Sequence, residues 1–479
     1  MASYDVIFIG GGPAGYVGAI RCAQLGLSTA VVEREGLGGT CVLWGCIPAK
    51  ALLESASLAN RVRHAADFGI TVGNDVKFDY GVAMKRSRAV STQNSKGVEF
   101  LFKKNKITWL KGTGRIAKGS GSAKPTVVVK DAAGKEESHE AKKGIVICTG
   151  SRVRGLPQVG LELNKTTVLS SDEALTVEKA PRTMAIIGAG AVGCEFADVF
   201  NAFGTQVTLI EVLPTILPVE DADASAELTR AFKKRKIDVL TGAKISNVKV
   251  GASTVSMSLE VTLAGGAAEK RTLEVEQVLV AAGRAPNVEE IGLKEAGVQL
   301  TDRGFIKVDT TTYETAAKGV FAIGDVIGAP MLAHKGQREG AILAERLAGQ
   351  HAHPLNYGNI PNATYCHPEV ASVGLTEQQC KEKKLEYKVG KFPFSANGRA
   401  RTSGETEGFV KIIRDTKYGE ILGAHIVDAH ATEILHELVV ARENEFTVEE
   451  VDLAIHAHPT LSEAIAEAAL DSMGRMLHA

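Results

Sequence analysis

Two cysteines near the start of the chain are close enough in sequence to share one chemical task. Cys41 and Cys46 are separated by four residues in GGTCVLWGCIPAK, which runs from Gly38 to Lys50. Seven cysteines in 479 residues do not form a secreted disulfide framework, so a close pair in a reducing compartment indicates redox or metal-binding chemistry. Positions five apart do not share a helix face, but a bend near the glycines and a turn before Pro48 would bring the sulfurs together. No second Cys or His pair at zinc spacing follows nearby, which argues against a metal, and inert buried thiols stay as an alternative.

A histidine and a glutamate near the C-terminus offer the base that thiol chemistry needs. The thiolate is the nucleophile, so a thiol must lose its proton before it attacks a disulfide. A base with a pKa near 7 does this best. His458 suits that task, and Glu463 can orient its imidazole if the backbone turns between them.

Such chemistry must be positioned by larger elements, and the first is a glycine-rich turn at the N-terminus. In order come an apolar strand Tyr4–Ile9, the turn GGGPAG, a helix Ala14–Leu25 and a strand Thr29–Glu33. Gly10 permits the tight turn, and Gly12 lets the backbone approach a pyrophosphate at the helix N-terminus. Gly15 allows close packing of helix on strand, and Glu33 can accept the ribose hydroxyls. The order of elements predicts a dinucleotide-binding βαβ unit.

The same arrangement recurs later in the chain. A strand Thr183–Ile187 leads to the turn GAGAVG with Gly188, Gly190 and Gly193, then a helix to about Phe203 and a strand Gln206–Glu211. Glu211 would bond a free ribose 2′-hydroxyl and repel a 2′-phosphate, and the next three residues supply no arginine. The second unit should therefore prefer NAD over NADP.

Composition limits the partners. Lys and Arg total 55 against 56 for Asp and Glu, so the net charge of -1 gives no footprint for nucleic acid or an anionic membrane. We find no run of ~20 apolar residues and no signal peptide before the first strand, so we expect a cytoplasmic protein without a membrane segment. The length predicts about three or four domains of ~100 to 200 residues.

Together these motifs resemble the pyridine nucleotide-disulfide oxidoreductases, over essentially the whole chain. GGTC and CIP with a lysine, both glycine turns, Gly324-Asp325 after a strand Gly319–Ile323, and HAHPTLSEA from His456 follow in that family's order. The segment HPTLSEA agrees letter for letter with members that oxidise protein-bound dihydrolipoamide with NAD⁺. The resemblance implies this activity, a redox-active disulfide between Cys41 and Cys46, and FAD as the relay to NAD.

The resemblance also implies residue roles. Cys41 would be attacked by the substrate and Cys46 would lie against the flavin, while His458 with Glu463 would be the acid-base pair and His456 structural. His458 would reach the disulfide from the neighbouring subunit, so the active unit would be a homodimer. The implied FAD contacts are Gly10, Gly12, Gly15, Glu33, Lys50, Gly114, Asp325, Met331, Leu332, Ala333 and His334. The implied NAD frame is Gly188, Gly190, Gly193, Glu211 and Gly283, with Glu195 pairing with Lys50.

The chain departs from the family's pattern around the cysteines. Leu43 and Trp44 replace the usual asparagine and valine, and Ala49 replaces the usual serine. Cys148 stands where alanine is more common, and we interpret it as a small buried thiol. No reacting atom is lost, but altered packing can change the disulfide's potential, for which ~30 mV corresponds to ~1.4 kcal/mol.

The expected fold class is α/β, with two Rossmann-like domains that bind FAD and NAD and a C-terminal α+β dimerisation domain. We expect an FAD-binding domain at 1–150, an NAD-binding domain at 151–276, a central domain that completes the FAD site at 277–350, and the interface domain at 351–479. Gly, Ser and Ala at 118–124 predict a hairpin loop.

The resemblance implies a lipoyl-bearing partner on a separate chain. This would be an acyltransferase subunit of a 2-oxoacid dehydrogenase complex or the H protein of glycine cleavage. Two alternatives stay open. One is a glutathione-reductase-like disulfide reductase, against which Glu211 and Leu461 speak, and the other is a mainly structural subunit of such a complex.

Overall fold

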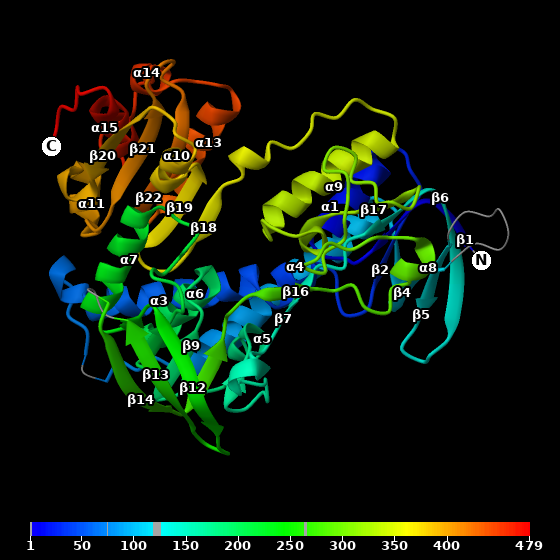
Figure 1. The fold of residues 1–479 in the computed structure, drawn as a ribbon, viewed down its shortest axis with the longest axis horizontal. Coiled ribbons are helices and arrows are strands. Elements are labelled where there is room, and N and C mark those ends of the chain that lie inside the picture. Colours follow the sequence, from blue (N-terminus) through cyan, green and yellow to red (C-terminus); the bar gives the residue numbers. More distant parts are fainter. Residues whose placement is uncertain (1, 74, 118–125, 263–265) are drawn as a thin grey trace. The chain divides into compact units, whose positions relative to one another are not determined.

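The computed structural model describes residues 2–73, 75–117, 126–262 and 266–479, which form two compact units. The first consists of Met1–Ala51, Met84–Arg154 and Gly283–Leu355, and the second of Leu52–Ala83, Gly155–Ala282 and Asn356–Ala479. The hairpin expected at 118–124 lies outside the described residues. Figure 1 shows the elements of both units.

The first unit is built on a mixed seven-stranded sheet. Its strand order is β3 (Thr108–Lys111), β2 (Thr29–Glu33), β1 (Ala2–Ile9), β6 (Glu136–Ile147), β5 (Thr126–Lys130) and β4 (Thr113–Ala117), and β17 (Val320–Ala322) also pairs with β6. The strands β3, β2, β1, β6 and β17 pair in parallel, whereas β4, β5 and β6 pair antiparallel. A short ladder joins β7 (Ser151–Val153) to β16 (Arg284–Pro286).

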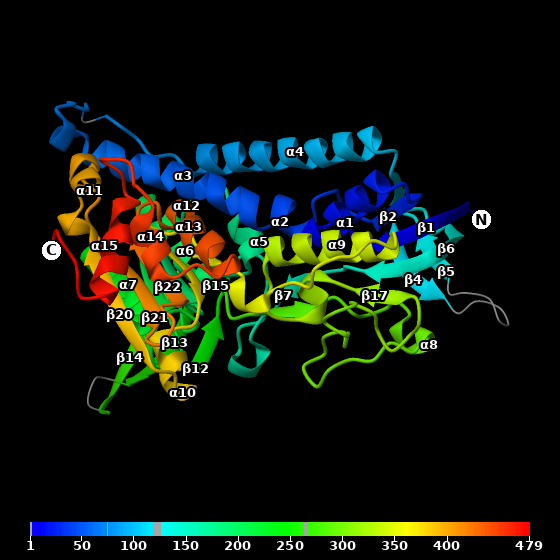
Figure 2. The ribbon, with the colours of Figure 1, turned by 90° about the horizontal axis from the view of Figure 1, so that it is seen from above.

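Both faces of that sheet are covered. Side chains of a strand alternate between faces, so Phe8 packs with α1 (Pro13–Gln24), α4 (Tyr80–Lys104) and α9 (Ala333–Leu347), while Ile7 packs against the β4–β5 side and the segment around Ile291. The helices α1 and α9 lie side by side, which both views show (Figure 2). The rest of the helical structure there is α2 (Gly39–Leu43), α8 (Leu293–Ala296), the 3-10 turn η3 (Gly324–Ile327) and the start of α3 (Cys46–Arg63).

One stretch of the described residues, Gly39–Arg63, has the length and hydropathy of a membrane span. Lys50 and Glu54 interrupt it, so the sequence contains no continuous apolar run there. The buried core helix of a protein outside membranes passes the same test, and the stretch is weak evidence for a span.

The second unit contains three sheets. A parallel sheet has the order β11 (Asp238–Leu240), β10 (Gln206–Ile210), β9 (Thr183–Ile187), β15 (Gln277–Val280) and β8 (Val168–Leu169). An antiparallel sheet follows with β12 (Ala243–Val250), β13 (Val255–Thr262) and β14 (Ala268–Val275). Their helices are α5 (Ser171–Ala174), α6 (Ala191–Ala202) and α7 (Ala222–Lys234).

The third sheet is wholly antiparallel, as expected for the C-terminal α+β region. Its order is β18 (Asn362–Thr364), β19 (Glu369–Gly374), β22 (Ile421–Asp428), β21 (Phe409–Asp415) and β20 (Tyr387–Pro393). The helices beside it are α10 (Glu377–Glu382), α11 (Gly398–Ser403), α12 (Ala431–Ile434), α13 (His436–Glu443), α14 (Val448–Leu453) and α15 (Glu463–Ser472).

A buried lysine ties α7 to this third sheet. Lys411 on β21 is 2% exposed, and its Nζ lies 2.8 Å from Asp221 Oδ1, 3.1 Å from Asp223 Oδ2 and 2.8 Å from Glu377 Oε2. Burial alone lowers the pKa of Lys411, but the carboxylates outweigh it and the pKa is raised. The region with the second glycine turn and the C-terminal sheet are thus joined by a charge cluster whose central pair, Lys411 and Asp221, is buried.

The elements agree closely with the sequence-based expectations. The strands Thr29–Glu33 and Thr183–Ile187 have the expected bounds, whereas β10 ends at Ile210, one residue before Glu211. The first helix begins at Pro13, because proline is favoured in the first helical turn, where its missing N–H costs nothing.

Candidate active site

Cys41 and Cys46 lie together at a break between two helices. Cys41 is in α2, which ends at Leu43, and Cys46 begins α3. The two sulfurs are not joined as a disulfide in the structure, and a hydrogen bond between the two side chains is the main cause of the raised pKa of Cys41, followed by burial. The positive charge of Lys50 acts in the opposite direction. The predicted turn is therefore present, at Trp44 and Gly45, and it gives the sulfur contact that spacing on one helix would not.

The first glycine turn needs its glycines for steric reasons. Gly10 has φ +118°, and a Cβ there would lie 2.3 Å from the Cys148 carbonyl oxygen. A Cβ on Gly15 would lie 2.1 Å from the Gly10 oxygen. Gly12 is the N-cap of α1 and has no side chain to satisfy the first N–H groups of the helix, which leaves them for an anion.

The acid at the end of β2 closes that turn. The Gly11 N–H donates to Glu33 Oε2 at 2.8 Å, and the Arg34 and Glu35 N–H groups donate to Oε1 at 2.7 and 3.0 Å. This places a carboxylate beside the N-terminus of α1, where the ribose next to a pyrophosphate would lie. The glycines and the acid fit a dinucleotide such as FAD.

The other expected FAD residues belong to the same unit. Asp325 in η3 accepts from Ser151 Oγ at 2.6 Å, and Ser151 accepts from Arg284 Nε at 2.7 Å. Met331 to His334 lie at the start of α9, where Leu332 is the N-cap. A Cβ on Gly114 would lie 3.0 Å from Val32 Cγ1, so this glycine packs against the strand before Glu33.

The second glycine turn repeats the geometry of the first. Gly188 has φ +100°, and a Cβ on Gly193 would lie 1.9 Å from the Gly188 oxygen. The Ala189 N–H donates to Glu211 Oε2 at 2.8 Å, and the Leu213 N–H donates to Oε1 at 3.0 Å. Gly190 is the N-cap of α6 and again offers no side-chain cap. These residues fit a second dinucleotide.

Three expected contacts involve both units. Glu195, on α6 in the second unit, accepts from the Tyr365 N–H at 3.1 Å, whereas Lys50 belongs to the first unit. The second unit includes β15 and runs on to Ala282. Gly283, the next residue, begins a segment of the first unit. The Lys50–Glu195 pair, the NAD contact of Gly283 and the approach of His458 to the cysteines stay predictions.

His458 and Glu463 form the expected pair. His458 Nδ1 lies 2.7 Å from Glu463 Oε1, and the Thr460 N–H donates to Oε2 at 2.8 Å. Burial opposes the charge of Glu463, but these hydrogen bonds outweigh it and lower its pKa. The His458 side chain is 79% exposed. A base with one nitrogen held and the ring open to solvent can receive a proton from a substrate thiol.

His456 has different surroundings. Its Nδ1 lies 2.8 Å from the Ala454 oxygen and its Nε2 lies 2.8 Å from Glu437 Oε1, so both ring nitrogens have partners. The hydrogen bond with Glu437 is the main cause of the raised pKa of His456. The structural role expected for His456 stays a prediction.

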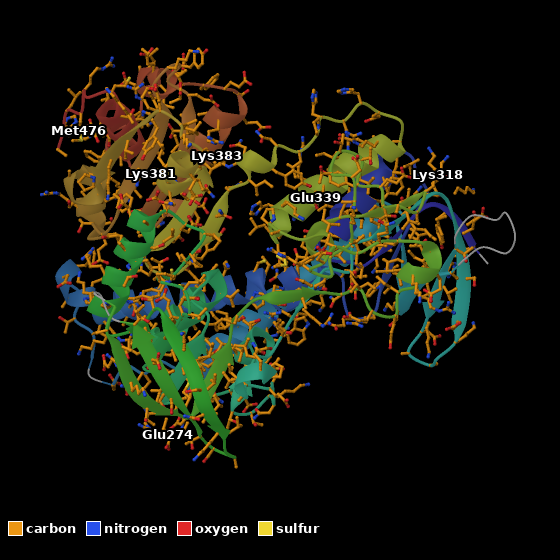
Figure 3. All side chains as sticks on the ribbon, viewed as in Figure 1. Glu274, Lys318, Glu339, Lys381, Lys383 and Met476 are labelled. Carbon is orange, nitrogen blue, oxygen red and sulfur yellow. The ribbon has the colours of Figure 1, made fainter. Side chains whose placement is uncertain are left out.

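Sequence reasoning missed several residues around the first site. Lys335 and Glu339 on α9 form a buried ion pair at 3.2 Å (Figure 3 labels Glu339). Lys335 Nζ donates to the Gly324 oxygen and Glu339 accepts the Gly324 N–H, which together hold the turn that carries Asp325. The i, i+4 spacing of the pair gave no signal, because such pairs are mostly surface features.

Tyr16 was also missed. It lies on α1 next to the glycine turn, and Gln337 Nε2 donates to its hydroxyl at 3.2 Å. Burial is the main cause of its raised pKa, and the nearby Cys41 and Cys46 add to it. This buried phenol is therefore close enough to the thiol pair for the charge of the pair to affect its pKa.

Comparison with known proteins places this chain in a class. The chain belongs to the pyridine nucleotide-disulphide oxidoreductase family, which matches residues 4–340, and residues 360–469 match that family's dimerisation domain. It is 44% identical over 486 residues to the dihydrolipoyl dehydrogenase of Rhizobium etli, an alignment that covers 100% of this chain and 99% of that one. It is 43% identical over 478 residues to the dihydrolipoyl dehydrogenase of Bacillus subtilis, with 99% of each chain covered.

A solved structure supports the same fold. The crystal structure of LpdA from Mycobacterium tuberculosis has a TM-score of 0.88 and 27% identity and covers 98% of this chain and 99% of that one. The expected fold class, with cofactor-binding regions and a dimerisation region, is confirmed.

Proposed function

We propose that this chain oxidises dihydrolipoamide and reduces NAD⁺, as a dihydrolipoyl dehydrogenase. The observation that carries the proposal is the hydrogen-bonded pair Cys41 and Cys46 at the α2–α3 break, in a chain about 44% identical over its full length to enzymes of that name. Two thiols within hydrogen-bond reach of each other are placed to form one disulfide.

Two dinucleotides fit the residues described. FAD would be held by Gly10, Gly12, Gly15 and Glu33, with Asp325, Gly114 and the start of α9 as further contacts, and NAD by the turn from Gly188 to Gly193 with Glu211. FAD, when bound, supplies the two-electron relay between the dithiol and NAD⁺. We propose one tightly held FAD per subunit. The support is that Glu33 and the closely packed Gly10 and Gly15 are all held in place by contacts within one compact unit.

The chain's own residues perform the thiol and proton steps. His458 takes the proton from a dihydrolipoamide thiol, and the resulting thiolate attacks Cys41, which breaks the Cys41–Cys46 bond and leaves Cys46 as a thiolate. The second substrate thiol then attacks the mixed disulfide, which releases lipoamide and leaves the Cys41–Cys46 dithiol. Two electrons and two protons leave the substrate. NAD⁺ takes up both electrons with one proton, and the other proton goes to solvent.

Glu463 orients the base in this scheme. Its carboxylate holds His458 Nδ1 and so directs the other ring nitrogen to the substrate. The charge of Glu463 also stabilises the imidazolium that forms. Lys50 would lie near the flavin and pair with Glu195.

We also propose how the enzyme is assembled. The match to a dimerisation domain supports a homodimer, in which His458 of the partner subunit would complete each active site. The lipoyl group would come from an acyltransferase subunit of a 2-oxoacid dehydrogenase complex or from the glycine cleavage H protein, in the cytoplasm. The division at 1–150, 151–276, 277–350 and 351–479 stays a prediction that limited proteolysis would test.

Anaerobic titration tests the function directly. Dihydrolipoamide should convert the purified yellow protein to a species with a long-wavelength thiolate-to-flavin band, and NAD⁺ should remove that band rapidly while NADP⁺ does so poorly. If dihydrolipoamide fails and NADPH with glutathione disulfide works, the substrate assignment is wrong. A Cys46→Ser variant that still turns over at the full rate would overturn the role of the pair.

A further inference from the structure

The buried side of α4 is polar where a helix is usually apolar. Ser87, Ser91 and Ser95 follow one another at four-residue spacing and are buried, with Met84 and Val98 buried on either side. A buried hydroxyl without a hydrogen bond costs stability, so such a stripe needs acceptors opposite it.

Those acceptors are carbonyl groups of the segment that carries the two cysteines. Ser91 Oγ donates to the Val42 oxygen at 2.6 Å, and Arg88 Nη1 donates to the Leu43 oxygen at 2.5 Å. The other two serines donate to carbonyls on either side of the cysteines. Ser87 Oγ donates to the Pro48 oxygen at 2.8 Å, and Ser95 Oγ donates to the Leu37 oxygen at 2.7 Å. The helix α4 thus lies along the α2 segment, as Figure 2 shows.

Two of these bonds fall at the break between the cysteines. Val42 and Leu43 are the last residues of α2, and the last carbonyls of a helix have no partner within it. The break at Trp44 and Gly45 is what allows residues five apart to touch, and it leaves those two carbonyls free. Ser91 and Arg88 satisfy them.

Arg88 also holds the residue at the break. Its guanidinium lies 4.6 Å from the centre of the Trp44 ring, and Trp44 Nε1 donates to Glu35 Oε2 at 3.1 Å. A guanidinium that both stacks on the indole and bonds the preceding carbonyl fixes the turn from two directions. Trp44 is one of the departures from the family's usual residues, so this contact is specific to chains with an aromatic residue at that position.

We propose that Ser91 and Arg88 are positioning residues for the Cys41–Cys46 disulfide, and that they favour its formation by holding the α2–α3 break. The inference rests on the proposed function, because it assumes that the pair cycles between dithiol and disulfide. Held sulfurs have a high effective concentration for one another, so a looser break makes the disulfide easier to reduce. Neither side chain reacts.

The test compares two serines on one helix. Ser91→Ala removes a bond at the break, while Ser95→Ala removes a buried bond of the same kind to the carbonyl of Leu37, outside the Cys41–Cys46 interval. Each FAD-loaded homodimer is equilibrated anaerobically with glutathione and glutathione disulfide. Two glutathione thiols give two electrons and two protons to the protein disulfide and become one glutathione disulfide. Alkylation and mass spectrometry then count free Cys41 and Cys46.

We expect Ser91→Ala, and Arg88→Lys as a second variant, to lower the equilibrium constant for disulfide formation about tenfold, which is about 30 mV for a two-electron couple. Ser95→Ala should stay within about twofold of the unaltered protein. Equal equilibrium constants for Ser91→Ala and Ser95→Ala would overturn the inference. So would a disulfide that becomes harder to reduce in Ser91→Ala and Arg88→Lys. If the unaltered protein forms no Cys41–Cys46 disulfide at any ratio, the proposed function itself has failed.

Discussion

The pair His458 and Glu463 gives the sharpest test of the proposed chemistry, through Glu463→Gln. The carboxylate accepts from Thr460 N–H with one oxygen and faces His458 Nδ1 with the other. Glutamine has a single oxygen, and a backbone N–H can only donate, so that oxygen must stay with Thr460. The amide NH₂ then faces Nδ1, which turns the imidazole to the tautomer that carries its proton on Nε2. The nitrogen open to the substrate can no longer accept a proton.

The size of the effect follows from the site. A hydrogen bond to a charged group contributes ~1.5 to 3 kcal/mol, which is ~10- to 150-fold in rate. The exposed His458 ring allows water to compensate in part, so we expect the lower half of this range for kcat/KM with dihydrolipoamide.

Steady-state kinetics of two matched variants, Glu463→Gln and Glu437→Gln, separate loss of the base from general damage to the enzyme. Reduction of a dye by NADH needs the cofactors but not the thiol step, so it should be unchanged in Glu463→Gln. The control is Glu437→Gln, which removes the same kind of partner from His456 and should leave kcat/KM within about twofold. The reasoning is refuted if Glu463→Gln has normal kcat/KM, or if the dye reaction falls by the same factor.

Three further changes have defined outcomes. Gly15→Ala forces a Cβ to 2.1 Å from the Gly10 oxygen and should yield protein without bound flavin by absorbance, whereas Gly97→Ala on α4, where nothing lies within 4 Å, should bind flavin normally. Lys411→Met leaves the buried Asp221 carboxylate without its cation and should destabilise the protein by ~3 to 5 kcal/mol in denaturant melts, while a loss below ~1 kcal/mol would contradict the buried Lys411–Asp221 pair. Burial raises the pKa of Asp428 to about 6, so the stability it contributes is present below the ordinary aspartate pKa and lost as the pH rises through 6. Asp428→Asn should therefore raise the melting temperature more at pH 8 than at pH 4.5, and an equal shift at both values would rule out this titration.

The sequence was most informative where local rules act alone. Glycines at turns with positive φ, a proline in the first helical turn and an acid at the end of a strand each follow from backbone geometry, so β2, β9 and the two carboxylate contacts were predictable. The pairing of His458 with Glu463 was expected on condition that the backbone turns between them, and it does.

What the sequence did not predict depends on tertiary packing. The serines of α4 look like ordinary polar residues of an exposed helix until the carbonyls opposite them are known. Lys335 and Glu339 look like a surface pair, and only the burial of α9 makes them a support for the Asp325 turn. The bounds of the compact units likewise depend on contacts distant in sequence, with α3 and α4 each contributing to both.

The contacts of Glu211 bear on attempts to change coenzyme preference by protein engineering. Replacing that acid with a small or basic residue is the obvious route to acceptance of a 2′-phosphate. Here the carboxylate also receives the backbone N–H groups of Ala189 and Leu213, so its removal would leave two donors without acceptors and loosen the turn itself. A successful redesign has to supply a replacement acceptor, such as a serine or asparagine oxygen, before it adds a positive charge nearby.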